Sequence, residues 1–182
     1  VGSSAEEKRR TAQAASELVS HGYTIALTAG TTTTEVIRCL HELSGITVIT
    51  NTANVAMELS NRKDINVFVT GGHLRGDWFS LVGPAAVATM KSLFVDIVFI
   101  GVNGIDAERG LTCFNADEAE INLAMVRQAK RKIVVADHSK LSVVGNWLIC
   151  PTDAVDMLIT DTCATDGTIA PFLERGIEVR RV

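Results

Sequence analysis

The sequence is poor in aromatic residues and carries no excess of positive charge. Aromatics make up 5% of the 182 residues, so Val, Ile, Leu and Ala must fill the core. That composition suits a parallel sheet covered by helices. Seventeen Lys and Arg stand against 21 Asp and Glu, a net charge of −4. A free-standing DNA-binding module is expected to be basic, because phosphate contacts supply most of its affinity, so the composition argues against that class.

The sequence also lacks the patterns of disulfide-rich, metal-binding and membrane proteins. Its four cysteines are widely spaced, with no CxxC pair and no histidine at ligand spacing: Cys39, Cys113, Cys150 and Cys163. We therefore predict reduced thiols in a cytoplasmic protein, with no metal and no cofactor. There is no signal peptide and no apolar run long enough to span a bilayer, so no membrane contact is expected. Residues 1–4 look like a linker or a cloning remnant.

Short β-branched runs alternate with helical stretches along the whole chain, which we treat as a single domain over residues 1–182. This alternation predicts an α/β fold in three layers, with a mostly parallel sheet flanked by helices. Glycine-punctuated segments at 101–115 and from 137 onward are expected to be loops. Helices are predicted at 5–20, 33–43, 52–61, 84–92, 117–130 and 168–175, and strands at 23–28, 46–50, 65–69, 96–100, 132–136, 157–160 and 177–180.

Polar residues follow nearly every predicted strand, and in a parallel sheet these loops open on one edge, where ligands bind. The first such loop is Gly30 followed by Thr31, Thr32, Thr33 and Thr34. Glycine allows close approach to an anion, and a helix N-terminus offers unpaired N–H groups with partial positive charge. The pattern favours phosphate binding as much as plain capping by one threonine. A Walker A lysine is lacking, so a nucleoside triphosphate is not expected.

Three further charged residues follow other strands of the predicted sheet. Arg75 could reach the same crevice as a fork for phosphate or carboxylate, or it could be a solvated surface residue. Asp137 and Lys140 lie three residues apart, so they would share one face of a helical turn. Asp can bind sugar hydroxyls and Lys a phosphate, whereas the structural alternative is a capping Asp and an exposed Lys.

Acidic and histidine side chains near these loops admit structural interpretations too. Glu118 and Glu120 begin the helix at 117–130, where the helix dipole favours acids. His73 and His138 flank the loops, but no pair has the spacing of metal ligands. The sequence therefore gives no indication of a metal site.

Taken together, these residues resemble the C-terminal effector-binding domain of the DeoR/GlpR family of bacterial transcriptional regulators. The matching stretches occur in the family's order, and the GGxxR, LVGP and DHSK segments make the set specific. They are EEKRRTAQAASELVSHGYTIALTAGTTTTEV (6–36), VITNTANVAMELS (48–60), VFVTGGHLRGDWFSLVGPAA (67–86), DIVFIGVNGIDAERGLTCFNADEAEI (96–121), VVADHSKL (134–141) and MLITD (157–161).

The resemblance implies a fold similar to the ribose-5-phosphate isomerase, glucosamine-6-phosphate deaminase and CoA-transferase superfamily. It implies a sensor of a phosphorylated sugar or polyol, acting as a homo-oligomer, dimer or tetramer. DNA would be bound only through an N-terminal winged helix-turn-helix that this chain lacks. By motif matching, the phosphate would be held by Thr31, Thr32 and Thr33. The adjoining loops would be lined by Asn51, Gly71, Gly72 and Arg75, and the sugar end would face Gly104, Glu118, Asp137 and Lys140.

The chain departs from the family pattern at Ala29, where Asp is frequent, and at Cys113, where a small or hydroxyl residue is common. Together with His73, a variable position, these leave the ligand's identity open. Two other functions compete with sensing. One is a sugar-phosphate isomerase-like enzyme, with Glu118 or Asp137 as base and Lys140 as cation. The other is a structural dimerisation module with a vestigial pocket.

Overall fold

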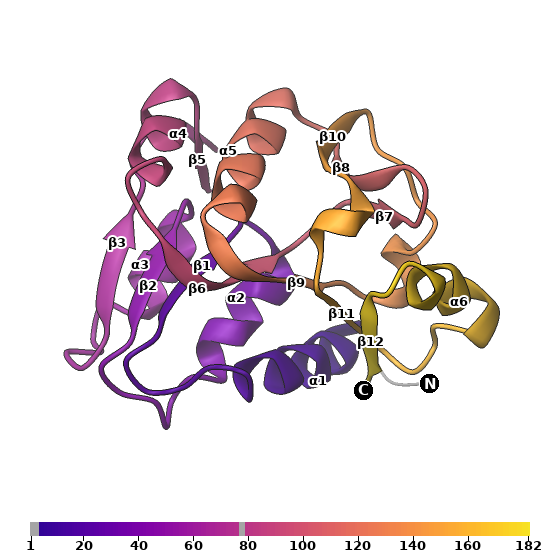
Figure 1. Ribbon diagram of the computed structural model, residues 1–182. Helices are drawn as coiled ribbons and strands as arrows, with labels where there is room; N and C mark the ends of the chain where they lie inside the picture. The colour runs from indigo at the N-terminus through magenta and orange to yellow at the C-terminus, as the bar shows by residue number, and fades with distance from the viewer. Residues whose placement is uncertain (1–3, 77–78) are drawn as a thin grey trace.

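A computed structural model of the chain describes residues 4–76 and 79–182 (Figure 1). Of the linker suggested at residues 1–4, residues 1–3 lie outside the described residues, and Ser4 is the first residue of helix α1. Seven strands form one sheet in the order β12-β11-β9-β6-β1-β2-β3, and every neighbouring pair is parallel. In chain order they are β1 (Thr24–Leu27), β2 (Thr47–Thr50), β3 (Asn66–Val69), β6 (Val95–Ile100), β9 (Ala129–Val135), β11 (Met157–Thr160) and β12 (Glu178–Arg181).

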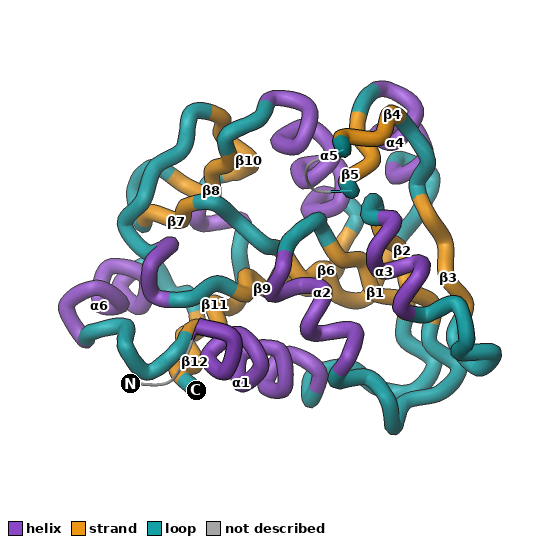
Figure 2. Tube along the Cα trace, turned by 180° about the vertical axis from the view of Figure 1, so that it is seen from behind, coloured by secondary structure: helices purple, strands orange, loops and turns teal. Residues whose placement is uncertain are grey.

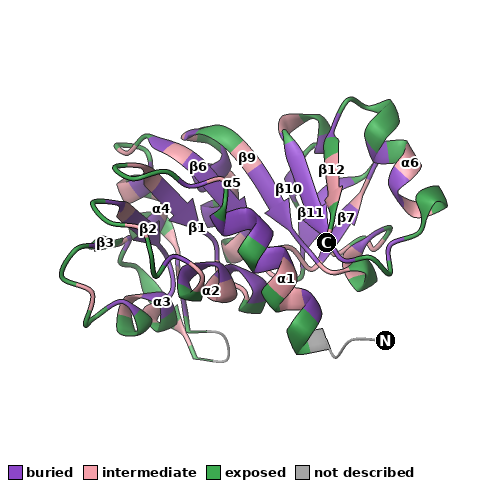
Figure 3. Cartoon of the chain, turned by 90° about the horizontal axis from the view of Figure 1, so that it is seen from below, coloured by how far each residue is buried: buried purple, intermediate pink, exposed green. Residues whose placement is uncertain are grey.

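Helices cover both faces of this sheet, which confirms the predicted three-layer α/β architecture. Helices α1, α2 and α3 lie across one face (Figure 3), and α4 and α5 lie on the other (Figure 1). None of the helices within the described ranges is both long and apolar enough to span a membrane. The bounds are α1 (Ser4–Ser16), α2 (Thr31–Arg38), α3 (Ala53–Glu58), α4 (Pro84–Met90), α5 (Ala116–Arg127) and α6 (Asp166–Glu174), with short 3₁₀ helices η1 (His138–Lys140) and η2 (Thr152–Ala154).

The core is divided in two by the sheet because successive side chains of a strand point to opposite faces. On β1, Ile25 and Leu27 pack toward α1, α2 and α3, whereas Ala26 between them packs toward α4 and α5. All three are fully buried, as expected of a central strand with helices on both sides. Aliphatic residues and alanines make up most of both halves, in agreement with the low aromatic content.

Five short strands occur where the sequence predicted only loops. The hairpin of β4 (His73–Arg75) and β5 (Ser80–Val82) follows β3 and lies beside α5 (Figure 2). A three-stranded sheet is formed by β7 (Gly104–Asp106), β8 (Gly110–Cys113) and β10 (Trp147–Cys150), in the order β10-β8-β7. Length does not explain the omission, because several strands of the main sheet also have four residues. The five strands pair with one another outside the alternation of strand and helix from which the main sheet was predicted.

The connections reverse direction between β1 and β6. From β1 the chain winds outward through β2 to the edge strand β3, and from β6 it winds the other way through β9 and β11 to β12. The loops that follow β1 and β6 therefore diverge, and a crevice opens between them at the carboxyl ends of the strands. The fold thus positions its binding crevice here.

Candidate ligand-binding site

A cavity of about 340 Å³ occupies this crevice. The loop after β1 supplies one wall, and the loop after β6 supplies a second. The remaining walls come from α1, the β4–β5 hairpin, β8, α5 and the segment after β9. The lining residues are Lys8, Ala29, Gly30, Thr31, Thr32, Arg75, Gly101, Val102, Asn103, Cys113, Phe114, Asn115, Glu118, Asn122, Val135, Ala136, Asp137 and Lys140.

The N-terminus of α2 opens into this cavity. Gly30 precedes the helix, and no side chain caps the first backbone N–H groups. Gly30, Thr31 and Thr32 all line the cavity, so these N–H groups and the partial positive charge of the helix end are available to an anion. Thr33 has another role, because its buried hydroxyl donates to the carbonyl oxygens of Thr28 at 2.7 Å and Gly30 at 2.9 Å.

Three cationic side chains line the cavity, and one of them already forms an ion pair with a carboxylate of the protein. The Arg75 guanidinium lies 2.5 Å from the Glu118 carboxylate, which also accepts a hydrogen bond from the Ser80 hydroxyl at 3.1 Å. Within the part of the chain that the structure describes, the Lys8 and Lys140 side chains form no hydrogen bond or ion pair. Two half-exposed ammonium groups are therefore free to bind an anion, whereas Arg75 fixes the orientation of Glu118.

Carboxylate and amide groups complete the cavity. The Asp137 carboxylate accepts a hydrogen bond from the Ser139 backbone N–H at 2.9 Å and thereby caps η1, which carries Lys140. The Asn103 side-chain oxygen accepts from the Phe114 N–H at 3.2 Å. These groups are the usual partners of sugar and polyol hydroxyls.

Cys113 also lines the cavity, and its thiol carries no charge there. Burial raises the pKa of this thiol above its ordinary value. The thiol donates a hydrogen bond to the Asn115 carbonyl oxygen, with 3.2 Å between sulfur and oxygen. A protonated thiol is a small, weakly polar group, so Cys113 adds shape to the cavity rather than charge.

Of the predicted site residues, the structure brings Thr31, Thr32, Arg75, Glu118, Asp137 and Lys140 together around one cavity. The other five shape the surrounding chain. Asn51 is fully buried and donates to the Leu81 carbonyl at 3.1 Å. Gly71 and Gly72 have φ values of +73° and +117° and start the β4–β5 hairpin. Gly104 faces the Val143 backbone so closely that a Cβ there would lie 2.2 Å from the carbonyl oxygen.

Sequence reasoning missed several lining residues, of which four are polar: Lys8, Asn103, Asn115 and Asn122. Lys8 belongs to the first helix, where a charged residue is typical of a solvated face. Asn122 lies inside the helix that the sequence predicted from its apolar stripe. Only Asn103 carried a local signal, because it follows the strand at 96–100 in a glycine-rich turn.

A polar cavity at the point where the strand order reverses is typical of an α/β domain that binds small molecules. The model of the DeoR C-terminal sensor domain family matches residues 3–162. The chain belongs to this family, which confirms the resemblance seen in the sequence. It is 36% identical over 172 residues to a putative aga operon transcriptional repressor of Escherichia coli O157:H7, covering 94% of this chain and 64% of that protein.

A second relative is the glycerol-3-phosphate regulon repressor of Escherichia coli K12, 30% identical over 153 residues, which are 82% of this chain and 61% of the repressor. The chain thus spans less than two thirds of the length of both relatives. Their names are those of transcriptional regulators, which supports a sensor domain over an enzyme.

Ribose 5-phosphate isomerase A of Methanocaldococcus jannaschii is similar in fold, with a TM-score of 0.52 at 22% identity. The match covers 76% of this chain and 55% of the isomerase. Because the identity is this low, the likeness concerns the fold alone, and it agrees with the fold expected from the sequence.

Proposed function

We propose that the cavity binds a phosphorylated sugar or polyol as the effector of a cytoplasmic transcriptional regulator. One observation carries the proposal: the uncapped N-terminus of α2 and the two unpaired lysines, Lys8 and Lys140, face the same cavity. A phosphate group would accept hydrogen bonds from the first N–H groups of α2 and from the hydroxyls of Thr31 and Thr32. The lysines would offset its charge.

The other end of the effector would meet Glu118, Asp137 and Asn103. Arg75 would act on the effector through Glu118, because its guanidinium is already paired with that carboxylate. The remaining predicted residues would support the site without touching the ligand: Thr33, Asn51, Gly71, Gly72 and Gly104. The name of one relative includes glycerol 3-phosphate, a phosphorylated polyol, which makes this compound a natural first probe.

The sensing function requires that the effector favour one arrangement of the regulator over another. In our proposal the regulator is a homo-oligomer, dimer or tetramer, whose winged helix-turn-helix domains lie outside this chain and read DNA as symmetric pairs. Effector binding would change the spacing of those domains. The isomerase-like alternative is not favoured, since the family is one of sensors and Glu118, one of its two candidate bases, is held by Arg75 and Ser80.

The test is a thermal-shift titration with glycerol 3-phosphate and a set of sugar phosphates, each beside its unphosphorylated parent. A ligand at 100 times its Kd stabilises a protein by roughly 2.7 kcal/mol. We expect a phosphate ester to raise the Tm where its parent does not, and Lys140→Met or Lys8→Met to remove most of the shift.

Lys63→Met is the matched control, because Lys63 is an exposed lysine in the segment between α3 and β3 that does not line the cavity. It should leave the shift unchanged. A parent compound that stabilises the protein as well as its phosphate ester would contradict the proposal, as would a shift that persists without both lysines.

A further inference from the structure

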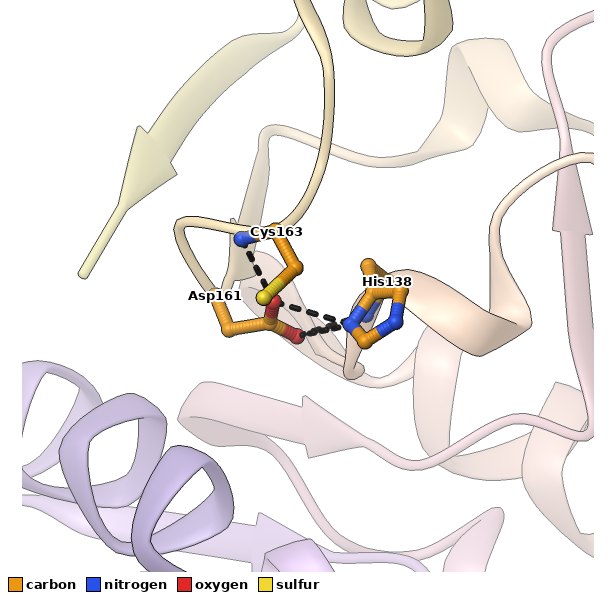
Figure 4. A group of neighbouring side chains, drawn as sticks. All are labelled: His138, Asp161 and Cys163. Carbon is orange, nitrogen blue, oxygen red and sulfur yellow. Dashed lines mark hydrogen bonds and ion pairs between the residues drawn. The ribbon is translucent and has the colours of Figure 1, made fainter. Parts of the chain in front are cut away.

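Three side chains with metal-binding chemistry meet outside the effector cavity. Strands β9 and β11 are neighbours in the sheet, with Val135 paired to Ile159, so the segments that follow them lie side by side. One segment carries His138 and the other carries Asp161 and Cys163 (Figure 4). Each offers one ligand atom, and the three atoms lie within 4.8 Å of one another.

Asp161 is the centre of this group. It is fully buried, and its carboxylate accepts hydrogen bonds from the backbone N–H groups of His138 at 2.7 Å and Cys163 at 2.8 Å. The His138 Nδ1 atom lies 2.9 Å from Asp161 Oδ1 (Figure 4). These contacts fix the imidazole and the sulfur beside the Asp161 carboxylate, and the three ligand atoms stay within 4.8 Å of one another.

A carboxylate from α1 lies beside this group. The Glu7 residue is only 5% exposed, and its carboxylate oxygen lies 3.8 Å from the Cys163 sulfur. In the described parts of the chain, that weak thiol contact is the only hydrogen bond or ion pair of the Glu7 side chain. Burying a carboxylate with so weak a hydrogen-bond donor destabilises the folded chain, and a bound cation would offset that destabilisation.

The spacing suits a tetrahedral ion. With metal–ligand bonds of about 2.0–2.3 Å, ligand atoms around such an ion are roughly 3.3–3.7 Å apart. Among the three clustered ligand atoms the separations run from 2.9 Å between His138 Nδ1 and Asp161 Oδ1 up to 4.8 Å, and Glu7 lies 3.8 Å from the Cys163 sulfur, so shifts of about 1 Å would bring these atoms to tetrahedral spacing. Thiolate and imidazole are poor ligands for Mg²⁺ or Ca²⁺ and good ones for zinc-like ions.

We propose that His138, Asp161 and Cys163, with Glu7 as fourth ligand, bind a divalent transition-metal ion such as Zn²⁺. On binding, the Cys163 thiol loses its proton to solvent. The neutral imidazole releases the Nδ1 proton that it donates to Asp161 and takes up a solvent proton on Nε2, so that the Nδ1 lone pair faces the ion. No spacing pattern indicates this site, because His138 and Asp161 are 23 residues apart and the pairing of β9 with β11 brings them together.

The test is a titration of the metal-free chain with Co²⁺, a spectroscopic substitute for Zn²⁺, in the absence of any sugar phosphate. We expect one Co²⁺ per chain, a thiolate-to-cobalt charge-transfer band, and loss of the band on addition of Zn²⁺. Cys163→Ser should abolish the band. His138→Gln should weaken Zn²⁺ binding by more than the roughly 10- to 100-fold that loss of an outer-shell partner costs.

Cys39→Ser is the matched control, since Cys39 is a free cysteine at the end of α2 and not a member of the cluster. It should keep both the band and the affinity for Zn²⁺. Absence of the band in the wild-type chain would overturn the proposal, and so would a band that survives Cys163→Ser or disappears equally in Cys39→Ser. Circular dichroism of each variant establishes that it is folded. The result is independent of effector binding, which is measured with sugar phosphates.

Discussion

Replacing Gly104 by alanine should destabilise the chain because the backbone of another segment occupies the space of the new methyl group. A Cβ at Gly104 would lie 2.2 Å from the Val143 carbonyl oxygen and 3.1 Å from the Thr112 hydroxyl. The nearest atom belongs to the backbone, so a side-chain rotation cannot relieve the overlap. Overpacking of this kind costs about 2–3 kcal/mol. For a chain of this length we expect the Tm to fall by roughly 4–12 °C.

Gly167→Ala is the control that separates this overlap from the general effect of adding a methyl group. Gly167 is exposed in the first turn of α6, and a Cβ there has nothing within 4 Å. Alanine is the better helix former, so this variant should be more stable by about 0.5 kcal/mol. Thermal and urea unfolding of the two variants measure the difference. A Gly104→Ala chain that melts within a degree of wild type would refute the reasoning, and would reopen a direct role for Gly104 in ligand contact.

Three other substitutions test the contacts around the site and the sheet. Thr33→Val removes two hydrogen bonds from a buried hydroxyl, so the free energy of unfolding should fall by about 1–3 kcal/mol while effector affinity, measured by calorimetry, is kept. Arg75→Met and Glu118→Gln should each cost about 0.5–2 kcal/mol, and the double variant less than their sum, because the partly exposed pair is lost only once. The backbone N–H of Thr24 and the Lys130 ammonium lower the pKa of Asp96. Its folded pKa is depressed, so its stabilisation is present above the unfolded pKa of 3.8 and is lost as pH falls through the folded value. Urea unfolding between pH 6 and pH 2 should show this loss in wild type and a flatter dependence in Asp96→Asn.

The main sheet and its helices could be predicted because their residues carry a local pattern. Ile25, Ala26 and Leu27 belong to a short β-branched and apolar run between a glycine and a polar turn, and the run is a central strand. The limits of the helices were less predictable. Helix α2 begins at Thr31 rather than at residue 33 and ends at Arg38 rather than at 43, because helix ends depend on capping contacts that composition reveals poorly.

What could not be predicted depends on contacts between distant segments. Lys8 and Lys140 line one cavity although 132 residues separate them, and no local pattern distinguishes such a lysine from a solvated one. The small sheet β10-β8-β7 depends on close backbone approaches, such as that of Gly104 to Val143, which carry no periodic signal. The polar loops after the strands were predictable as a group, since parallel strands all end at one edge.

The first turns of α1 place two consecutive residues in two different environments. Glu7 contacts Cys163, and Lys8 lines the effector cavity. If both proposals hold, one helix carries a ligand for a metal ion and a ligand for a phosphate, and the two binding equilibria are thermodynamically linked. Whatever factor the ion applies to the affinity for the effector, the effector must apply to the affinity for the ion. The response of the regulator to its effector would then depend on the concentration of the metal ion as well. The metal concentration would shift the sugar-phosphate concentration at which the regulator responds.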